Sequence, residues 1–213
     1  MICVAIQEKD VNRCIKLLEN IEMAEIRIDL ACFDADAVKQ IFSSTKKPLI
    51  ATCRPNPLTD LQRIDLLKVA IANGAAMVDV EIESTKVFKD EIVAFARKHR
   101  TQVIVSYHNF ESTPSKVMLD EIVKECYASG ADIAKIATMV NSIQDNARLL
   151  SLYDSNNKLV ILGMGQLGKI TRITATLLGS VFTFAAIDED SATAPGQVSF
   201  KKLENLIDSI KNS

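Results

Sequence analysis

The sequence of 213 residues contains no tryptophan, only two histidines, and aromatic residues at just 5%. It has no apolar run near the roughly 18 residues that cross a membrane as a helix, so we expect no contact with a membrane. The N-terminus lacks the basic stretch and the apolar core of a secretory leader. The lack of both signals favours a cytoplasmic protein.

Neither sign of charge is in excess, with 25 lysines and arginines against 27 aspartates and glutamates. So small an imbalance provides no basic surface field, which predicts that nucleic acid is not a partner. The five cysteines never form C-x-x-C, and their odd number is typical of free thiols in a reducing compartment. The histidines are too few and the cysteines too dispersed for metal-ligand spacing, so we expect no metal.

Short runs rich in valine and isoleucine recur along the whole chain, and each has the length of a strand. Helical spacing and helix boundary signals fill the segments between them, such as Asp10 and Asp34 as caps and Thr113-Pro114 at the start of a helix to Ala128. Eight strand–helix units in strict alternation predict a single-domain (β/α)8 TIM barrel, an α/β fold over residues 1–213. The runs are 2–6, 25–30, 48–53, 77–82, 102–107, 132–137, 159–164 and 180–185.

The seventh run ends in Gly163-Met164-Gly165-Gln166-Leu167-Gly168, which matches the G-x-G-x-x-G fingerprint of dinucleotide-binding folds. Those folds need at least two more strands downstream, whereas a single strand run remains here. We therefore interpret the glycines as a turn of the barrel and expect no nucleotide cofactor. A phosphate bound by the same glycines stays the alternative, since barrels hold phosphates after the seventh strand.

Charged side chains interrupt the apolar runs where barrel strands would end. Glu25, Arg27 and Asp29 alternate on the second run, which places them on one face. Inward charges on six neighbouring strands would carry a heavy desolvation cost in a purely structural core. We therefore expect a polar active site at the carboxyl ends of the strands. The other charges in this set are Arg54, Asp79, Glu81, Glu83, His108, Lys135 and Arg172.

Lys135 and His108 are the residues of this set that suggest a reaction. Lys135 lies in the apolar run 132–137, where burial and nearby arginines would lower its pKa and free an amine to attack a ketone. Pairing with Asp79 or Glu81 is the structural alternative. His108 follows the adjoining strand, within reach for proton transfer near neutral pH. The other histidine, His99, ends a basic helix and is expected at the surface.

Seven short motifs in the right order make the chain resemble the type I 3-dehydroquinate dehydratases, (β/α)8 Schiff-base enzymes of the shikimate pathway. The resemblance covers essentially the whole chain. It implies a hydro-lyase that converts 3-dehydroquinate into 3-dehydroshikimate in aromatic amino acid biosynthesis, without a cofactor, as a homodimer. The motifs are Glu25-Ile-Arg27-Ile-Asp29, Thr52-Cys53-Arg54, Val78-Asp79-Val80-Glu81, Ser106-Tyr107-His108-Asn109-Phe110, Ala131 to Ala137, Met164 to Gly168 with Thr171-Arg172, and Ala194-Pro195-Gly196-Gln197.

The resemblance also implies a role for each matching position. Lys135 would form the imine at the C3 ketone. His108 would remove a C2 proton and then assist the departure of the C1 hydroxyl. Arg172 would hold the substrate carboxylate, and residues 187–196 would close over the substrate as a lid. The remaining positions that would bind substrate or line its pocket are Glu25, Arg27, Arg54, Thr193 and Gln197.

The chain departs from the family pattern in several places, including Ala5 where Ser is common and Asn109 where Asp is usual. Two further departures are larger. The chain starts almost at its first strand, without the N-terminal hairpin of longer members. The loop from Arg54 to Asp60 is short and lacks the glutamate that orients the catalytic histidine, for which Asp60 or Glu81 is a candidate replacement. Two other functions therefore stay open. One is another Schiff-base barrel, such as an aldolase or transaldolase acting on a sugar phosphate, and the other is a degenerate, non-catalytic barrel that binds a metabolite.

Overall fold

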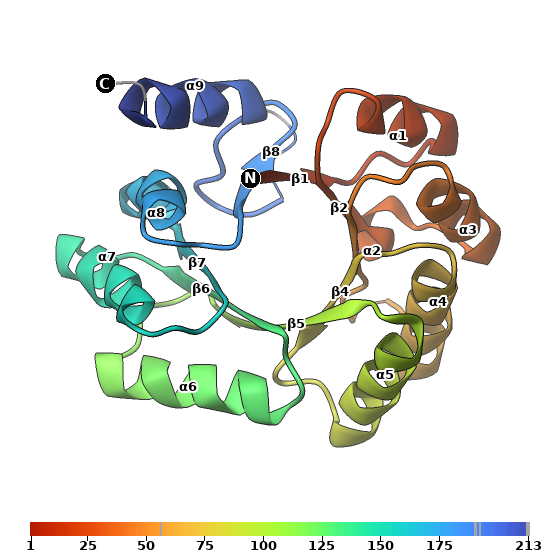
Figure 1. Cartoon of the computed structure of the whole chain (residues 1–213), viewed down its shortest axis with the longest axis horizontal. Coiled ribbons are helices and arrows are strands. Elements are labelled where there is room, and N and C mark those ends of the chain that lie inside the picture. Colours follow the sequence, from red (N-terminus) through yellow and green to blue (C-terminus); the bar gives the residue numbers. More distant parts are fainter. Residues whose placement is uncertain (56, 190, 192, 212–213) are drawn as a thin grey trace.

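The computed structural model describes residues 1–55, 57–189, 191 and 193–211. Parallel strands form a nearly closed barrel with the helices around its outside (Figure 1). The sheet has eight strands in the order β7-β6-β5-β4-β3-β2-β1-β8, which confirms the expected (β/α)8 fold. The strands are β1 Ile2–Ile6, β2 Ala24–Arg27, β3 Leu49–Thr52, β4 Met77–Glu81, β5 Gln102–Asn109, β6 Ile133–Met139, β7 Leu159–Met164 and β8 Thr183–Ala186.

The helices begin where the sequence supplies capping side chains. Asp10 accepts a hydrogen bond from the amide of Arg13, and Asp34 accepts one from the amide of Ala37, as both positions predict. Each such bond satisfies an amide that the first helical turn leaves without a partner. The helices are α1 Val11–Leu18, α2 Ile28–Ala31, α3 Ala35–Ser43, α4 Asp60–Ala72, α5 Lys86–His99, α6 Lys116–Ala128, α7 Ile143–Leu150, the 3-10 helix η1 Ser151–Asp154, α8 Gly165–Leu177 and α9 Phe200–Lys211.

Several expected boundaries are wrong by up to three residues, such as the start of β8 at Thr183 rather than at residue 180, and two of them change the role of a residue. β2 ends at Arg27, and Asp29 lies in the short helix α2, where its carboxylate accepts two hydrogen bonds from the Arg27 guanidinium. Helix α6 begins at Lys116 because Ser115 supplies the cap. The hydroxyl of Thr113 instead forms hydrogen bonds at the end of β6, with Oγ1 of Thr138 and with the carbonyl of Met139.

The inward-facing side chains of the barrel change character along its axis. A lower layer is apolar and includes Ile50, Met77, Ile104 and Ile133. Two residues further along each strand the same face carries polar side chains, because alternate strand residues point to the same side. Those upper side chains are Thr52, Asp79, Ser106 and Lys135, all buried. The polar layer therefore rests on a closed apolar floor, at the carboxyl ends of the strands.

The glycines of the fingerprint close the packing of α8 on β7. A Cβ on Gly163 would lie 2.9 Å from the Cα of Gly168, closer than real Cβ contacts come. Thr171 locks this approach, since its Oγ1 accepts from the amide of Gly163 and donates to the carbonyl of Gly168, both at 2.7 Å. The match to the dinucleotide motif thus arises from strand-to-helix packing that orients α8, the helix that carries Arg172.

All five cysteines are free thiols in the described structure. Four of them are buried, whereas Cys32 is exposed at the end of α2, in the left-handed region with φ 57°. Across the described residues, no helix combines the length and the apolar character that a membrane span requires.

Candidate active site

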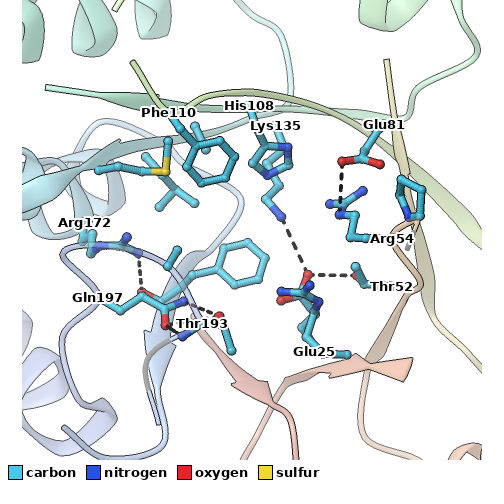
Figure 2. Close-up of a pocket in the computed structure, with 17 residues that line it drawn as sticks. Glu25, Thr52, Arg54, Glu81, His108, Phe110, Lys135, Arg172, Thr193 and Gln197 are labelled. Atoms are coloured by element: carbon cyan, nitrogen blue, oxygen red, sulfur yellow. Dashed lines mark hydrogen bonds and ion pairs between the residues drawn. The ribbon is translucent and has the colours of Figure 1, made fainter. Parts of the chain in front are cut away.

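A cavity of about 320 Å³ opens above the polar layer. All eight residues that the sequence nominates line it: Glu25, Arg27, Arg54, His108, Lys135, Arg172, Thr193 and Gln197. They come from β2, the end of β3, β5, β6, α8 and the loop before α9, so the barrel brings together positions far apart in the chain (Figure 2). Apolar and aromatic lining residues without an assigned role include Leu162 and Phe184, which lie outside the motifs, and Phe110 and Met164, which lie within them.

Lys135 is 5% exposed and faces the cavity from the middle of β6. Its Nζ donates to Asp79 at 2.9 Å and lies 3.7 Å from Glu25 and 4.5 Å from the centre of the Phe184 ring. The ion pair with Asp79, given above as the structural alternative, is therefore present. It does not turn Lys135 away from the histidine, because both side chains line the same cavity (Figure 2) and the charge of Lys135 contributes to the lowered pKa of His108.

Asp79 is the common partner of the cations on this side of the cavity. Besides Lys135, it accepts from Arg54 Nη2 at 2.8 Å and from Ser106 Oγ at 2.6 Å. Burial alone would raise the pKa of Asp79, but Arg54 and Lys135 outweigh it and hold the pKa well below its ordinary value. The strand pattern predicts an inward carboxylate here, yet no spacing in the sequence indicates that two cations share it.

Glu25, Arg27 and Arg54 are held by neighbours rather than free in the cavity. Glu25 accepts from the Thr52 hydroxyl at 2.8 Å, and Arg27 is fixed by Asp29 at 3.0 and 2.6 Å. Arg54 also reaches Ser106 at 3.2 Å. Such fixed side chains present their remaining polar atoms to a ligand in a defined geometry, which is what a pre-organised site requires.

His108 lies within β5, one residue before its end, with Nδ1 buried. Among the described residues Nδ1 has no hydrogen-bond partner. Because Nδ1 is buried and His108 lines the cavity, Nε2 is the ring nitrogen that we expect to meet a molecule there. Burial, followed by the nearby charges of Arg54 and Lys135, holds the pKa of His108 well below the ordinary 6.5. The imidazole is therefore neutral at neutral pH, the form that accepts a proton.

The two candidate replacements for the missing glutamate have other partners. Asp60 pairs with Arg63 at 2.9 Å, and Glu81 lies 3.7 Å from Arg54 and 3.9 Å from Arg63. Neither bonds His108 in the described part of the chain, and residue 56 of this loop lies outside it.

Arg172 closes the opposite side of the cavity and is 2% exposed. Its Nε donates to the carbonyl of Gly196 and its Nη1 to that of Phe184, both at 3.1 Å. No carboxylate among the described residues pairs with it, and burial lowers its pKa to about 10. A buried cation without a counter-charge favours an anionic ligand, because the missing charge would be supplied on binding.

Thr193 and Gln197 bring a second segment to this side. The amide of Thr193 donates to Gln197 Oε1 at 2.7 Å, and Gln197 Nε2 donates to Thr193 Oγ1 at 3.0 Å. The pair holds residues 193–197 as a compact turn over the cavity. Residues 190 and 192 of the expected lid lie outside the described residues. The described residues contain no cluster of His, Cys, Asp and Glu that could hold a metal ion.

Fold and cavity together define a class: a (β/α)8 barrel with a cavity of charged side chains at the carboxyl ends of its strands, where barrel enzymes have their active sites. The family model described as Type I 3-dehydroquinase matches residues 2–213. The chain belongs to the type I 3-dehydroquinase family. This membership confirms the resemblance seen in the sequence and the expectation of a hydro-lyase.

Individual relatives agree with the family. The chain is 36% identical to a 3-dehydroquinate dehydratase of Methanococcus maripaludis strain C5, over 99% of this chain and all of that protein, and 36% identical to one of Methanocaldococcus jannaschii over 97% of both. Among solved structures, the type I 3-dehydroquinate dehydratase of Clostridium difficile superposes with a TM-score of 0.87 at 27% identity, covering 99% of this chain and 92% of that one. A 3-hexulose-6-phosphate synthase shares the fold alone, with a TM-score of 0.63 at 16% identity over 98% of both chains.

Proposed function

We propose that this chain dehydrates 3-dehydroquinate to 3-dehydroshikimate through a Schiff base on Lys135, with His108 as the acid–base residue. One observation carries the proposal. An amine and a neutral imidazole share a cavity whose far side holds a buried arginine without a counter-carboxylate. The relatives' names supply the substrate, and the cavity supplies one group for each demand of the reaction.

The reaction starts at Lys135. The ammonium first gives a proton to the Glu25 carboxylate beside it, since Asp79 is held in its charged form, and the amine attacks the C3 ketone to form a carbinolamine. Glu25 returns the proton to the carbinolamine hydroxyl, which leaves as water, and the two carboxylates then stabilise the positive charge of the iminium. The iminium then draws electrons from the neighbouring C2–H bond more strongly than the ketone would.

His108 performs the proton transfers that follow. Its neutral Nε2 takes the C2 proton, and the electron pair of that bond forms an enamine. The enamine pushes out the C1 hydroxyl, which leaves as water with the proton returned by the imidazolium. Hydrolysis of the imine releases 3-dehydroshikimate and restores Lys135. The low pKa of His108 supports this assignment, because the base form is present at neutral pH.

Arg172 would bind the substrate carboxylate. Its Nε and one Nη1 proton are taken by backbone carbonyls, so Nη2 and the second Nη1 proton are left to bind both carboxylate oxygens end-on. Held there, the ring would extend across the cavity towards Lys135. Glu25, Arg27, Arg54, Thr193 and Gln197 would hold the hydroxyl groups or line the ring, as the resemblance implies.

A direct experiment tests this function. The protein is incubated with 3-dehydroquinate while the enone absorbance of 3-dehydroshikimate is followed, and borohydride is then added before mass spectrometry. We expect turnover and a reduced adduct on Lys135, with Lys135→Met as the control that shows neither. Binding without turnover or adduct would support the degenerate barrel instead.

The sugar-phosphate alternative is less well supported. It requires the turn at Gly165 to hold a phosphate, but the amide of Gly165 donates to the carbonyl of Pro195 at 3.2 Å. One of the amides in the Gly165 to Gly168 turn that would receive the anion is thus taken by the chain itself. Turnover of a phosphorylated sugar, with none of 3-dehydroquinate, would reverse this preference.

We also propose that the chain forms a homodimer in the cytoplasm. Ile143 on α7 is 75% exposed, and α7 lies against α8, which exposes Leu167 and Ile170. On the same helix Ala147 is also exposed, whereas Leu150 is half-buried. Free buried thiols fit a reducing compartment. Light scattering of the wild type should give a dimer mass, and Ile143→Glu should lower it.

A further inference from the structure

Gly165 and Gly196 bring two distant stretches of backbone into direct contact. Both have positive φ, 78° and 76°. A Cβ on Gly196 would lie 2.9 Å from the N and C atoms of Gly165 and closer still to its carbonyl oxygen. The amide of Gly165 donates to the carbonyl of Pro195 at 3.2 Å. The 193–197 segment therefore sits on the first turn of α8 with no room for a side chain on Gly196.

The same seat is joined to the cavity. The carbonyl of Gly196 accepts from Arg172 Nε at 3.1 Å, so the cation that faces the cavity also holds the segment. Thr193, Ala194 and Gln197 of this segment line the cavity. A shift of the segment away from Gly165 would therefore move lining residues and remove a hydrogen bond from Arg172 together.

We propose that the Gly165–Gly196 contact is a latch that couples seating of the 193–197 segment to carboxylate binding at Arg172. Gly165 and Gly196 are positioning residues, which act through Arg172, Thr193 and Gln197. Coupling of this kind is reciprocal: a carboxylate on Arg172 stabilises the seated segment, and the seated segment strengthens carboxylate binding by the same factor. The inference rests on the proposed function for the identity of the carboxylate.

The latch also gives a role to the middle glycine of the fingerprint. In a dinucleotide fold the second glycine lets a pyrophosphate approach the backbone closely. Here the group that approaches Gly165 is the chain's own Pro195-Gly196 backbone. Gly163 and Gly168 serve the packing of strand on helix, whereas Gly165 serves the segment over the cavity.

The chain offers a matched pair of variants. Gly196→Ala places a methyl group against Gly165 and forces a left-handed residue to carry a side chain. Gly179→Ala also forces a residue with positive φ, here 101°, to carry a side chain, but its Cβ would meet nothing within 4 Å. A difference between the two variants therefore reports the contact and not the strain.

We expect Gly196→Ala to raise the KM for 3-dehydroquinate by about tenfold or more, within the usual range of coupling between sites. Borohydride should still trap Lys135 at saturating substrate. Gly179→Ala should keep kcat and KM within about twofold of the wild type. Hydrogen exchange of the Gly165 amide, followed by NMR in the free protein, should accelerate about tenfold in Gly196→Ala and not in Gly179→Ala, because the bond to Pro195 is lost.

Arg172→Lys tests the same coupling from the carboxylate-binding residue rather than from the glycines. It keeps the charge and removes the Nε–Gly196 bond, so we expect faster exchange of the Gly165 amide with both glycines intact. Wild-type exchange in Gly196→Ala or in Arg172→Lys would overturn the latch. Because exchange is measured without substrate, it tests the latch independently of activity. A wild type that does not dehydrate 3-dehydroquinate would overturn the proposed function and leave the latch standing.

Discussion

The two sides of the cavity treat positive charge in opposite ways. On the side of β2 to β6, Lys135 and Arg54 share Asp79, with Glu25 and Glu81 close by. On the side of β7 and β8, Arg172 has only the carbonyl oxygens of Gly196 and Phe184 among the described residues. Both sides belong to one cavity, yet one is internally neutralised and the other is left positive.

This difference assigns separate tasks to the two sides. A charge that already has its partners gains little from a further anion, whereas a buried cation without one gains a great deal. Under the proposed function, Arg172 would orient an anionic substrate. The uncharged end of the substrate would then lie towards Lys135, where the carboxylates would stabilise a cation that forms during the reaction.

The largest expected effect comes from removing the amine of Lys135, on the side of the cavity where the charges are paired. We expect Lys135→Met to lower kcat by at least about 10,000-fold, as loss of a covalent nucleophile does elsewhere. Stopped assays with 3-dehydroquinate measure this, and mass spectrometry after borohydride should show no adduct. An active Lys135→Met would show that the neutralised side is structural only.

Removing the imidazole tests the proton transfers on the same side. We expect His108→Gln to lower kcat by about 100- to 10,000-fold, the usual contribution of a general acid–base group. The wild-type kcat/KM should stay flat as pH falls to 6.5 and decline only below it, since the pKa of His108 is depressed from that value. His99→Gln, at the exposed end of α5, is the control and should behave as the wild type. A decline that begins above pH 6.5 would contradict the neutral imidazole.

Removing the unpartnered cation tests the other side. We expect Arg172→Met to raise KM by about 10- to 100-fold, which corresponds to the ~1.5–3 kcal/mol of hydrogen bonds to a charged group. Arg97→Met, which loses a surface pair with Asp132, should leave KM unchanged. Equal KM values for wild type and Arg172→Met would place the substrate carboxylate elsewhere.

The smallest effect concerns stability. The folded pKa of His108 lies below 6.5, so the unfolded chain binds more protons as pH falls through that value, and stability is lost on the acid side. The free energy of unfolding of the wild type should fall between pH 7 and pH 5.5, and His108→Gln should make this fall smaller by up to about 1 kcal/mol. Partial solvent screening of the imidazole lowers this figure. Urea unfolding at both pH values measures it, and parallel losses in wild type and variant would refute it.

The sequence predicts the barrel well because its signals are local. Short apolar runs and capping residues such as Asp10 and Asp34 specify each unit without reference to the others. The parallel barrel then places the strand ends together, which is why all eight nominated residues reach one cavity. The alternation of Glu25, Arg27 and Asp29 wrongly placed Asp29 on a strand. A turn in which Asp29 accepts hydrogen bonds from Arg27 has the same alternation in the sequence, so the two cannot be told apart there.

What the sequence does not indicate is which distant groups meet. Asp79 serves two cations from β6 and the end of β3, and Gly165 meets Gly196 from a different loop. Neither contact has a spacing or a composition of its own. For the same reason the sequence does not predict the surroundings of His108. Asp60 and Glu81, the two candidate partners, lie beside Arg63 instead, and no local pattern indicates that contact.

The accessibility of the cysteine thiols can be used to measure whether the barrel is folded. Burial raises the pKa of Cys14, Cys53 and Cys126 to about 12. Burial, followed by the charge of Glu25, also raises the pKa of Cys3 well above its ordinary value, so these thiols form almost no thiolate at neutral pH. A thiol reagent should therefore label the native chain once, at Cys32, and the denatured chain five times. The labelling ratio is a readout of unfolding that needs neither tryptophan nor an introduced probe.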